Sequence, residues 1–245
     1  MFPKGLIVSS QALEGNPLRN SEYLAVMAQA AALGGASAIR ANGVEDIREI
    51  RKRTALPIIG IDKRKDRSGR TVITPDFDGA KRVRDAGATI IALDVTDYPS
   101  DITEDRATLI KRLHEELGVL VMADISTVEE AVKAAKMGVD AVSTTLAGYI
   151  PGALHTEDEL YVPNFTLIKE IADRKLGCAL VAEGRIWERS DLAKAFSLGA
   201  DVFYEKSISQ FSTFVNRHLQ IFTRRFYSNI HFSTGNNKAE VACDL

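Results

Sequence analysis

The chain has little cysteine and no long apolar segment, and each shortage excludes a class of protein. Only two cysteines, Cys178 and Cys243, occur among 245 residues, so we expect no disulfide framework and a reducing compartment. Cys178 lies in an apolar run and is expected to be a small core residue. No signal peptide is visible at Met1–Gly5, and no run approaches the roughly 18 apolar residues of a membrane span. These features favour a cytoplasmic protein without a membrane partner.

An excess of charge, a metal-binding pattern and a nucleotide fingerprint are also lacking. Thirty-three acidic residues nearly balance 31 basic ones, giving a formal net charge of -2, so no nucleic-acid partner is expected. The four histidines stand in no cluster with the spacing of metal ligands. No P-loop or dinucleotide-binding glycine pattern follows the first apolar run. We therefore expect no metal and no cofactor.

What the chain does contain is a regular alternation of short apolar runs and amphipathic helical segments. The runs are nearly continuous in apolar character, which is typical of parallel strands buried on both faces. The strand candidates are Leu6–Ser10, Ala38–Arg40, Ile58–Lys63, Thr89–Val95, Leu120–Ile125, Ala141–Thr145, Ala179–Glu183 and Asp201–Tyr204. Glycines such as Gly87, Gly118 and Gly199 end the helical segments, because glycine readily adopts the left-handed conformation that terminates a helix.

Short polar residues mark where several helices should begin. Ser21 is the predicted N-cap of one helix, Ser126 or Thr127 of another, and Ser190 or a neighbour of a third. Steady alternation of eight strands with helices, in a chain of this length, favours an α/β fold with a single (β/α)8 TIM barrel. A doubly wound open sheet is the alternative. The predicted domain covers residues 1–225, and residues 226–245 form an atypical, aperiodic C-terminal tail.

Two insertions interrupt this alternation. Asp66–Pro75 follows the third strand and is predicted to form a short hairpin over the barrel mouth. Ile150–Pro163 follows the sixth strand and is predicted to form a mobile lid. An ordinary surface loop is an equally good interpretation of either insertion.

Polar residues stand at the end of seven of the predicted strands. They are Gln11, Arg40, Lys63, Asp94, Asp124, Thr145 and Glu183. Active sites of such barrels lie at the carboxyl ends of the strands, so these side chains should converge on one site. Buried charges are costly unless they are paired or used, and a ring of ion pairs closing the barrel is the structural alternative. A lysine and a glutamate near each other could move protons.

The same residues carry a resemblance to a known family. The chain resembles the N-acetylmannosamine-6-phosphate 2-epimerases from residue 5 to about residue 200. The matching blocks are Gly5–Leu13, Ala38–Gly43, Pro57–Lys63, Val72–Pro75, Ile91–Asp94, Met122–Thr127, Ser143–Tyr149 and Ala182–Ile186.

The resemblance implies both a reaction and the residues that perform it. Members of the family interconvert N-acetylmannosamine 6-phosphate and N-acetylglucosamine 6-phosphate in amino-sugar and sialic acid breakdown. Inversion at C2, beside the C1 aldehyde of the open-chain sugar, requires a base, a proton donor and stabilisation of the enolate oxygen. Lys63 matches the family's catalytic lysine and Glu183 its partner carboxylate. Gln11, Arg40 and Asp124 match the family's substrate-binding positions, and Gly184 and Arg185 match the part of its phosphate site that follows the seventh strand. Thr145 is a further candidate contact of the substrate.

After the eighth strand the chain departs from the family pattern. The family has a glycine-bearing phosphate turn there, whereas this chain has Glu205, Lys206 and Ser207. Lys206 and Ser207 are the candidate replacements, since lysine binds phosphate as a point charge. A catalytically impaired or non-catalytic sugar-phosphate-binding barrel is therefore an alternative, as is an aldolase that forms a Schiff base on Lys63. The sequence leaves open whether the chain forms a homodimer.

Overall fold

The computed structural model describes residues 1–150, 162–186 and 189–205. These residues belong to one compact unit, Met1–Ser209. Several sequence predictions lie outside the described residues. They are most of the lid at Ile150–Pro163, the phosphate contacts of Lys206 and Ser207, Cys243, the boundary at residue 225 and the tail.

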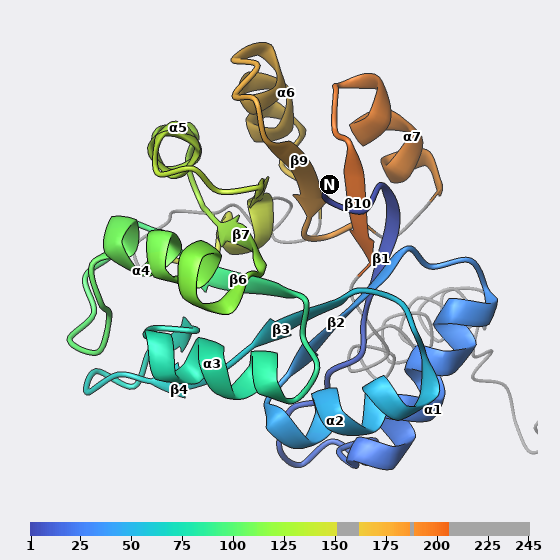
Figure 1. The fold of residues 1–245 in the computed structure, drawn as a ribbon. Coiled ribbons are helices and arrows are strands. Elements are labelled where there is room, and N and C mark those ends of the chain that lie inside the picture. Colours follow the sequence, from blue (N-terminus) through green and yellow to red (C-terminus); the bar gives the residue numbers. More distant parts are fainter. Residues whose placement is uncertain (151–161, 187–188, 206–245) are drawn as a thin grey trace, which may run out of the picture. The chain divides into compact units, whose positions relative to one another are not determined.

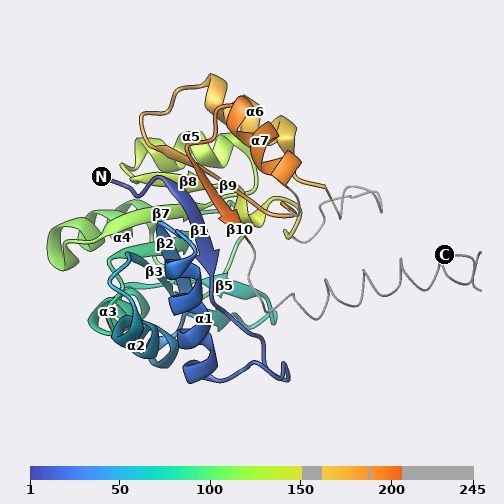
Figure 2. The same ribbon diagram turned by 90° about the vertical axis from the view of Figure 1, so that its right-hand side faces the viewer.

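Eight parallel strands of the described residues close into a barrel, so the TIM-barrel prediction is confirmed and the open sheet is wrong. The strand order around the barrel is β1-β10-β9-β8-β7-β6-β3-β2. Closure comes from the parallel pairing of the first and last strands, in which Leu6 opposes Phe203 (Figure 2). The strands are β1 (Gly5–Ser9), β2 (Ala38–Asn42), β3 (Ile58–Ile61), β6 (Ile90–Asp94), β7 (Leu120–Asp124), β8 (Ala141–Ser143), β9 (Ala179–Glu183) and β10 (Val202–Glu205).

Helices surround the barrel in the order of the sequence, as Figure 1 shows. They are α1 (Ser21–Leu33), α2 (Val44–Arg53), α3 (Phe77–Asp85), α4 (Arg106–Arg112) with its π-helical continuation η1 (Leu113–Leu117), α5 (Val128–Lys136), α6 (Phe165–Asp173) and α7 (Arg189–Ser197). A short 3₁₀ turn, η2 (Thr144–Leu146), follows β8. Within the described ranges, no helix combines the length and apolarity needed to cross a membrane.

Successive strand residues face two different cores. Ile59 and Ile61 belong to the cluster inside the barrel, whereas Ile58 packs in the layer between strands and helices. The other strands follow the same period of two, as Ile90 lies inside and Ile91 outside. A residue that continues the inward series past the last apolar position therefore points into the barrel mouth.

Local hydrogen bonds explain where the helices begin. Asn20, and not Ser21 as predicted, is the N-cap of α1, because Asn20 has the extended backbone and its side chain accepts from the N–H groups of Glu22 and Tyr23. Ser21 instead donates to Asp46, with 2.6 Å between the oxygen atoms. Thr127 caps α5 as predicted, in a reciprocal capping box with Glu130. Ser190 lies inside α7, which begins at Arg189.

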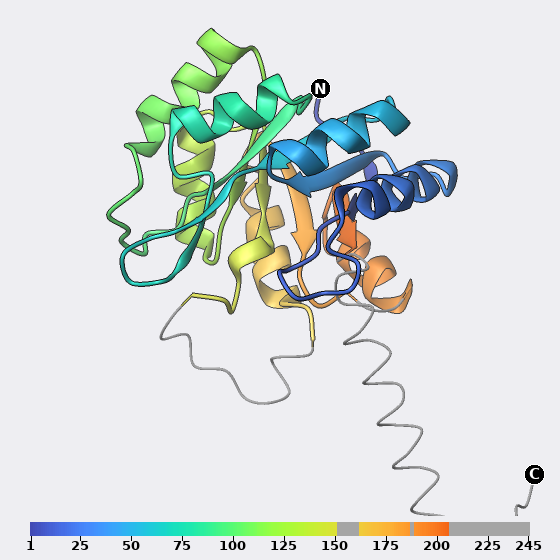
Figure 3. The same cartoon turned by 90° about the horizontal axis from the view of Figure 1, so that it is seen from below.

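The insertion after β3 forms a hairpin, as predicted, but the hairpin begins at Lys63 and not at Asp66. Strands β4 (Lys63–Lys65) and β5 (Thr71–Ile73) pair antiparallel beside the barrel sheet. The predicted strand Ile58–Lys63 is therefore divided, and β3 ends at Ile61. Figure 3 shows this hairpin (teal) on the same side of the barrel as the loop after β1 (dark blue). The carboxyl ends of the barrel strands are on that side.

Gly60 offers a test of how tightly the helices pack on the barrel. A Cβ added there would lie 2.5 Å from the Cβ of Ala88 and 3.2 Å from Cδ1 of Ile47. We expect Gly60→Ala to lower the free energy of unfolding by about 1–3 kcal/mol, because the packed layer must shift to accommodate the methyl group. Urea unfolding followed by circular dichroism measures the change.

Gly34→Ala is the matched control. Gly34 has φ -77°, and an added Cβ would meet only carbonyl oxygens of its own helix at 3.4 Å. We expect a change within about 0.5 kcal/mol for this variant. Equal losses in the two variants would contradict tight packing at Gly60.

Candidate active site

The residues predicted at the strand ends continue the inward-facing series of their strands. Arg40 stands two residues after Ala38, Asp124 two after Met122 and Glu183 two after Val181, and all three preceding residues lie inside the barrel. The barrel geometry therefore brings these side chains to one mouth, as the strand-end pattern predicted.

Arg40 and Asp124 form a buried ion pair with two hydrogen bonds. Nη1 of Arg40 donates to Oδ1 of Asp124 at 3.0 Å, and Nη2 donates to Oδ2 at 2.6 Å. The two side chains are 2% and 0% exposed, so water competes little for either charge. Nη1 also lies 3.6 Å from Oε2 of Glu183, which makes Arg40 the common neighbour of both carboxyl groups.

Thr145 lies between the same two carboxyl groups. Its Oγ1 is 2.7 Å from Oδ1 of Asp124 and 2.5 Å from Oε2 of Glu183. Ser143, which is fully buried, places its Oγ 2.8 Å from Oγ1 of Thr145. The four oxygen atoms thus form one hydrogen-bonded cluster at the ends of β7, β8 and β9.

The neighbouring residue, Thr144, fixes the backbone of Glu183. Its hydroxyl donates to the carbonyl oxygen of Glu183 at 2.7 Å and accepts the N–H of Glu183 at 2.9 Å. The strand predicted at Ala141–Thr145 ends at Ser143, and the two threonines lie in the 3₁₀ turn η2. Because the chain turns there, both hydroxyl groups reach β9. The roles of Ser143 and Thr144 were missed by the sequence prediction, which treated these residues only as a strand end.

Lys63 and Gln11 form a second part of the site. Nζ of Lys63 donates to Oε1 of Gln11 at 2.9 Å, and Gln11 in turn donates from Nε2 to Oγ of Ser9. The backbone N–H of Lys63 donates to Oδ1 of Asn42, at the end of β2. The expectation that Lys63 is a buried charge is wrong: the side chain is exposed, because Lys63 begins the hairpin and not a barrel strand.

Gly184 and Arg185 follow Glu183 in a turn with unusual backbone angles. Gly184 has φ 100° and Arg185 φ 61°, and a positive φ in a non-glycine residue costs free energy and is concentrated at functional sites. The Arg185 side chain is buried, donates to the carbonyl oxygen of Ala147 at 3.0 Å and lies over the ring of Tyr149. Arg185 thus ties β9 to the segment after η2.

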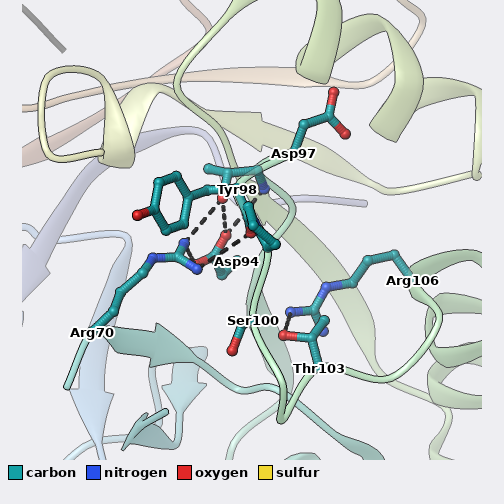
Figure 4. A pocket seen from close by; sticks show the side chains of 9 residues that line it. Arg70, Asp94, Asp97, Tyr98, Ser100, Thr103 and Arg106 are labelled. Atoms are coloured by element: carbon teal, nitrogen blue, oxygen red, sulfur yellow. Dashed lines mark hydrogen bonds and ion pairs between the residues drawn. The ribbon is translucent and has the colours of Figure 1, made fainter. Parts of the chain in front are cut away.

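A cavity of about 260 Å³ lies beside this site, between the hairpin and the loop after β6 (Figure 4). Asp94, the register neighbour of Asp124, forms its inner wall. Arg70 of the hairpin forms an ion pair with Asp94, donates to Thr96 and lies over the ring of Tyr98. The sequence prediction missed Arg70, although Arg70 lies in the insertion that was expected to cover the mouth.

Two ionisable groups of the cavity have shifted pKa values. Burial raises the pKa of Asp94, although hydrogen bonds from Thr96 and the charges of Arg70 and Arg106 oppose the shift. Burial lowers the pKa of Arg106 to about 10, against the opposing charge of Asp94. Arg106 donates to the carbonyl oxygen of Pro75 and to Thr103.

The site offers proton-transfer groups and hydrogen-bond donors. The described residues contain no group of three or more His, Cys, Asp or Glu side chains arranged to hold a metal ion. An amine, two carboxyl groups and several hydroxyl groups could remove a proton from a polar substrate, return one and bind its hydroxyls. Of the residues predicted from sequence, Arg40, Asp124, Thr145 and Glu183 lie together, and Gln11 lies with Lys63.

Comparison with known proteins identifies relatives of nearly full length. A family described as "Putative N-acetylmannosamine-6-phosphate epimerase" matches residues 24–221. Two relatives are named "Putative N-acetylmannosamine-6-phosphate 2-epimerase". The one from Caldanaerobacter subterraneus subsp. tengcongensis is 42% identical over 92% of this chain and 94% of its own. The one from Clostridioides difficile is 46% identical over 79% of this chain and 84% of its own.

A solved structure agrees with these sequence matches. The N-acetylmannosamine-6-phosphate 2-epimerase from Clostridium perfringens superposes with a TM-score of 0.77 at 38% identity, covering 92% of this chain and 93% of its own. The family match extends to residue 221, past residue 200, where the sequence resemblance was expected to end. On the extent of the family match and the identity of its relatives, the chain belongs to the N-acetylmannosamine-6-phosphate epimerase family.

Proposed function

We propose that this protein is an isomerase that inverts C2 of N-acetylmannosamine 6-phosphate to give N-acetylglucosamine 6-phosphate. The proposed enzyme name is N-acylglucosamine-6-phosphate 2-epimerase, and the proposed role is in amino-sugar and sialic acid breakdown. The observation that carries the proposal is the placement of Lys63 and Glu183, an amine and a carboxyl group, at one barrel mouth in a member of this family.

The reaction needs two proton transfers at one carbon atom. In the open-chain sugar, the C2 hydrogen is acidic because the electrons left behind spread onto the C1 oxygen as an enolate. A base removes that hydrogen, and an acid on the other face of C2 returns one. Each positioned acid or base contributes about 10²- to 10⁴-fold to the rate. Lys63 and Glu183 are the proposed pair.

The surrounding contacts suggest a role for each neighbour. Gln11 holds Nζ of Lys63 and is the proposed contact of a substrate hydroxyl or carbonyl. Arg40 and Asp124, at 2% and 0% exposure, are better suited to hold Glu183 in place than to bind the sugar themselves. The substrate-binding roles that the family resemblance implied for Arg40 and Asp124 become positioning roles in this proposal.

The phosphate is proposed to bind near the ends of the seventh and eighth barrel strands. Gly184 supplies a backbone N–H group beside Glu183, and Arg185 supplies a cation near η2. In TIM barrels phosphate groups often bind at the loops after these strands. Lys206 and Ser207, which follow β10 in sequence, are the proposed further contacts. The catalytic domain is proposed to cover residues 1–225.

Incubation with N-acetylmannosamine 6-phosphate in deuterated water tests the reaction directly. We expect N-acetylglucosamine 6-phosphate that carries deuterium at C2, because the returned proton comes from a group that exchanges with solvent. Proton NMR follows the loss of the C2 signal. A folded protein that binds the sugar phosphate without product or exchange would contradict the proposal and favour the non-catalytic barrel.

A pair of lysine variants tests the base. Lys63→Met should lower the rate of C2 exchange at least about 10²-fold, because methionine has no lone pair of comparable basicity. Lys65→Met is the matched control. Lys65 is on the same strand and is exposed, and among the described residues its side-chain amine donates only to the carbonyl oxygen of Gly69. Comparable losses in both variants would rule out a proton-transfer role for Lys63. So would a sugar adduct on Lys63 that is trapped by borohydride reduction of a Schiff base.

A further inference from the structure

The hydroxyl group of Thr145 has two carboxyl neighbours but only one hydrogen atom to donate. Oγ1 of Thr145 lies at hydrogen-bond distance from a carboxyl oxygen of Asp124, at 2.7 Å, and from one of Glu183, at 2.5 Å. A threonine hydroxyl carries a single hydrogen, and an ionised carboxylate carries none. Two oxygen atoms 2.5 Å apart repel unless a hydrogen lies between them. One of the two carboxyl groups must therefore supply a hydrogen of its own.

The additional hydrogen atom is not on the carboxyl group of Asp124. Both of its oxygen atoms accept charge-assisted hydrogen bonds from the guanidinium of Arg40, at 3.0 and 2.6 Å. This two-bond geometry stabilises the ionised carboxylate, and a proton on either oxygen would weaken it. The Thr145 hydrogen therefore points to Oδ1 of Asp124.

The remaining contact assigns the second hydrogen to Glu183. Resting on the proposed function, we infer that Glu183 stands in the resting enzyme as the neutral acid, donating its proton to Thr145, which donates its own hydrogen to Asp124. Thr145 is thus a positioning residue for the proton donor and not a substrate contact. Oγ1 of Thr145 has two lone pairs, so the hydroxyl of Ser143, at 2.8 Å, can donate to it as well.

Arg40 lies closer to Asp124 than to Glu183. Nη1 and Nη2 of Arg40 donate to Asp124 within 3.0 Å, whereas Oε2 of Glu183 lies 3.6 Å from Nη1. This cation favours the ionised form of Glu183, so the neutral form rests on the hydrogen count at Thr145 and on burial. The side chain of Glu183 is 4% exposed, and burial favours the neutral form of a carboxyl group. Thr144 holds the backbone of Glu183 at both its N–H and its carbonyl oxygen, which restricts where the carboxyl group of Glu183 can lie.

The arrangement defines the state of the acid before the reaction. When Lys63 is unprotonated, its lone pair takes the C2 proton, the C–H electrons move into the enolate, and the O–H bond of Glu183 breaks as its proton passes to the other face of C2. Lys63 has then gained one proton and Glu183 has lost one. The Thr145 hydroxyl turns from Asp124 to the new carboxylate of Glu183, while Asp124 keeps both bonds from Arg40. Exchange with water restores the starting state.

Infrared difference spectroscopy tests the protonation state without turnover. The spectrum of the wild-type protein minus that of Glu183→Gln, at neutral pH, should contain one carboxylic acid carbonyl band that shifts in deuterated water. A carboxylate band in its place would overturn the inference, whether or not the protein is an epimerase. An acid band in a protein without C2 exchange would uphold the inference and refute the proposed function.

Two Thr145 variants test the positioning role. Thr145→Val keeps the shape and removes the hydroxyl, so kcat for C2 exchange should fall at least about tenfold while KM changes less than about threefold. Thr145→Ser keeps the hydroxyl and should recover both kcat and the infrared band. A rise in KM with unchanged kcat would instead identify Thr145 as a substrate contact and overturn the assignment, as would an unaltered acid band in Thr145→Val.

Discussion

The site depends on the buried ion pair of Arg40 and Asp124. Taking two charges out of water is expensive, and only good geometry with further hydrogen bonds offsets that cost. Here the pair has two direct bonds, and its remaining capacity is used by Thr145 and by the approach of Glu183. Removing either member would leave a buried charge without its main partner. The pair therefore fixes in one place the strand ends of β2 and β7 and, through their neighbours, that of β9.

One geometric rule builds both the core and the site. Alternate residues of each strand face the barrel axis, and they are apolar as long as other side chains surround them. Where the barrel opens, the same series continues with Arg40, Asp94, Asp124 and Glu183. No separate scaffold is needed to gather these groups, because parallel strands of similar length end at the same level. The candidate site lies at the point where the packing requirement ceases.

Much of this arrangement could be predicted from the sequence. The period of two, the apolar runs and the terminating glycines fix the strands and the barrel class, and the last polar residue of each run identifies the mouth. The rest depends on tertiary contacts that leave no local signal. Asn20 and Ser21 are both good caps, and only the backbone conformation decides between them. The exposure of Lys63 follows from a hairpin that begins at Lys63, three residues before the predicted start at Asp66, and Arg70 reaches Asp94 only because that hairpin folds over.

The hairpin also places the two members of the proposed acid–base pair on different parts of the structure. The amine of Lys63 is carried by a two-stranded ribbon outside the barrel sheet, whereas the carboxyl of Glu183 is anchored in the barrel wall by backbone bonds to Thr144. A change in the length or twist of the ribbon would therefore move the base relative to a stationary acid. The position of the proposed base can therefore be altered through the ribbon while the buried contacts among Arg40, Asp124 and Glu183 stay as they are.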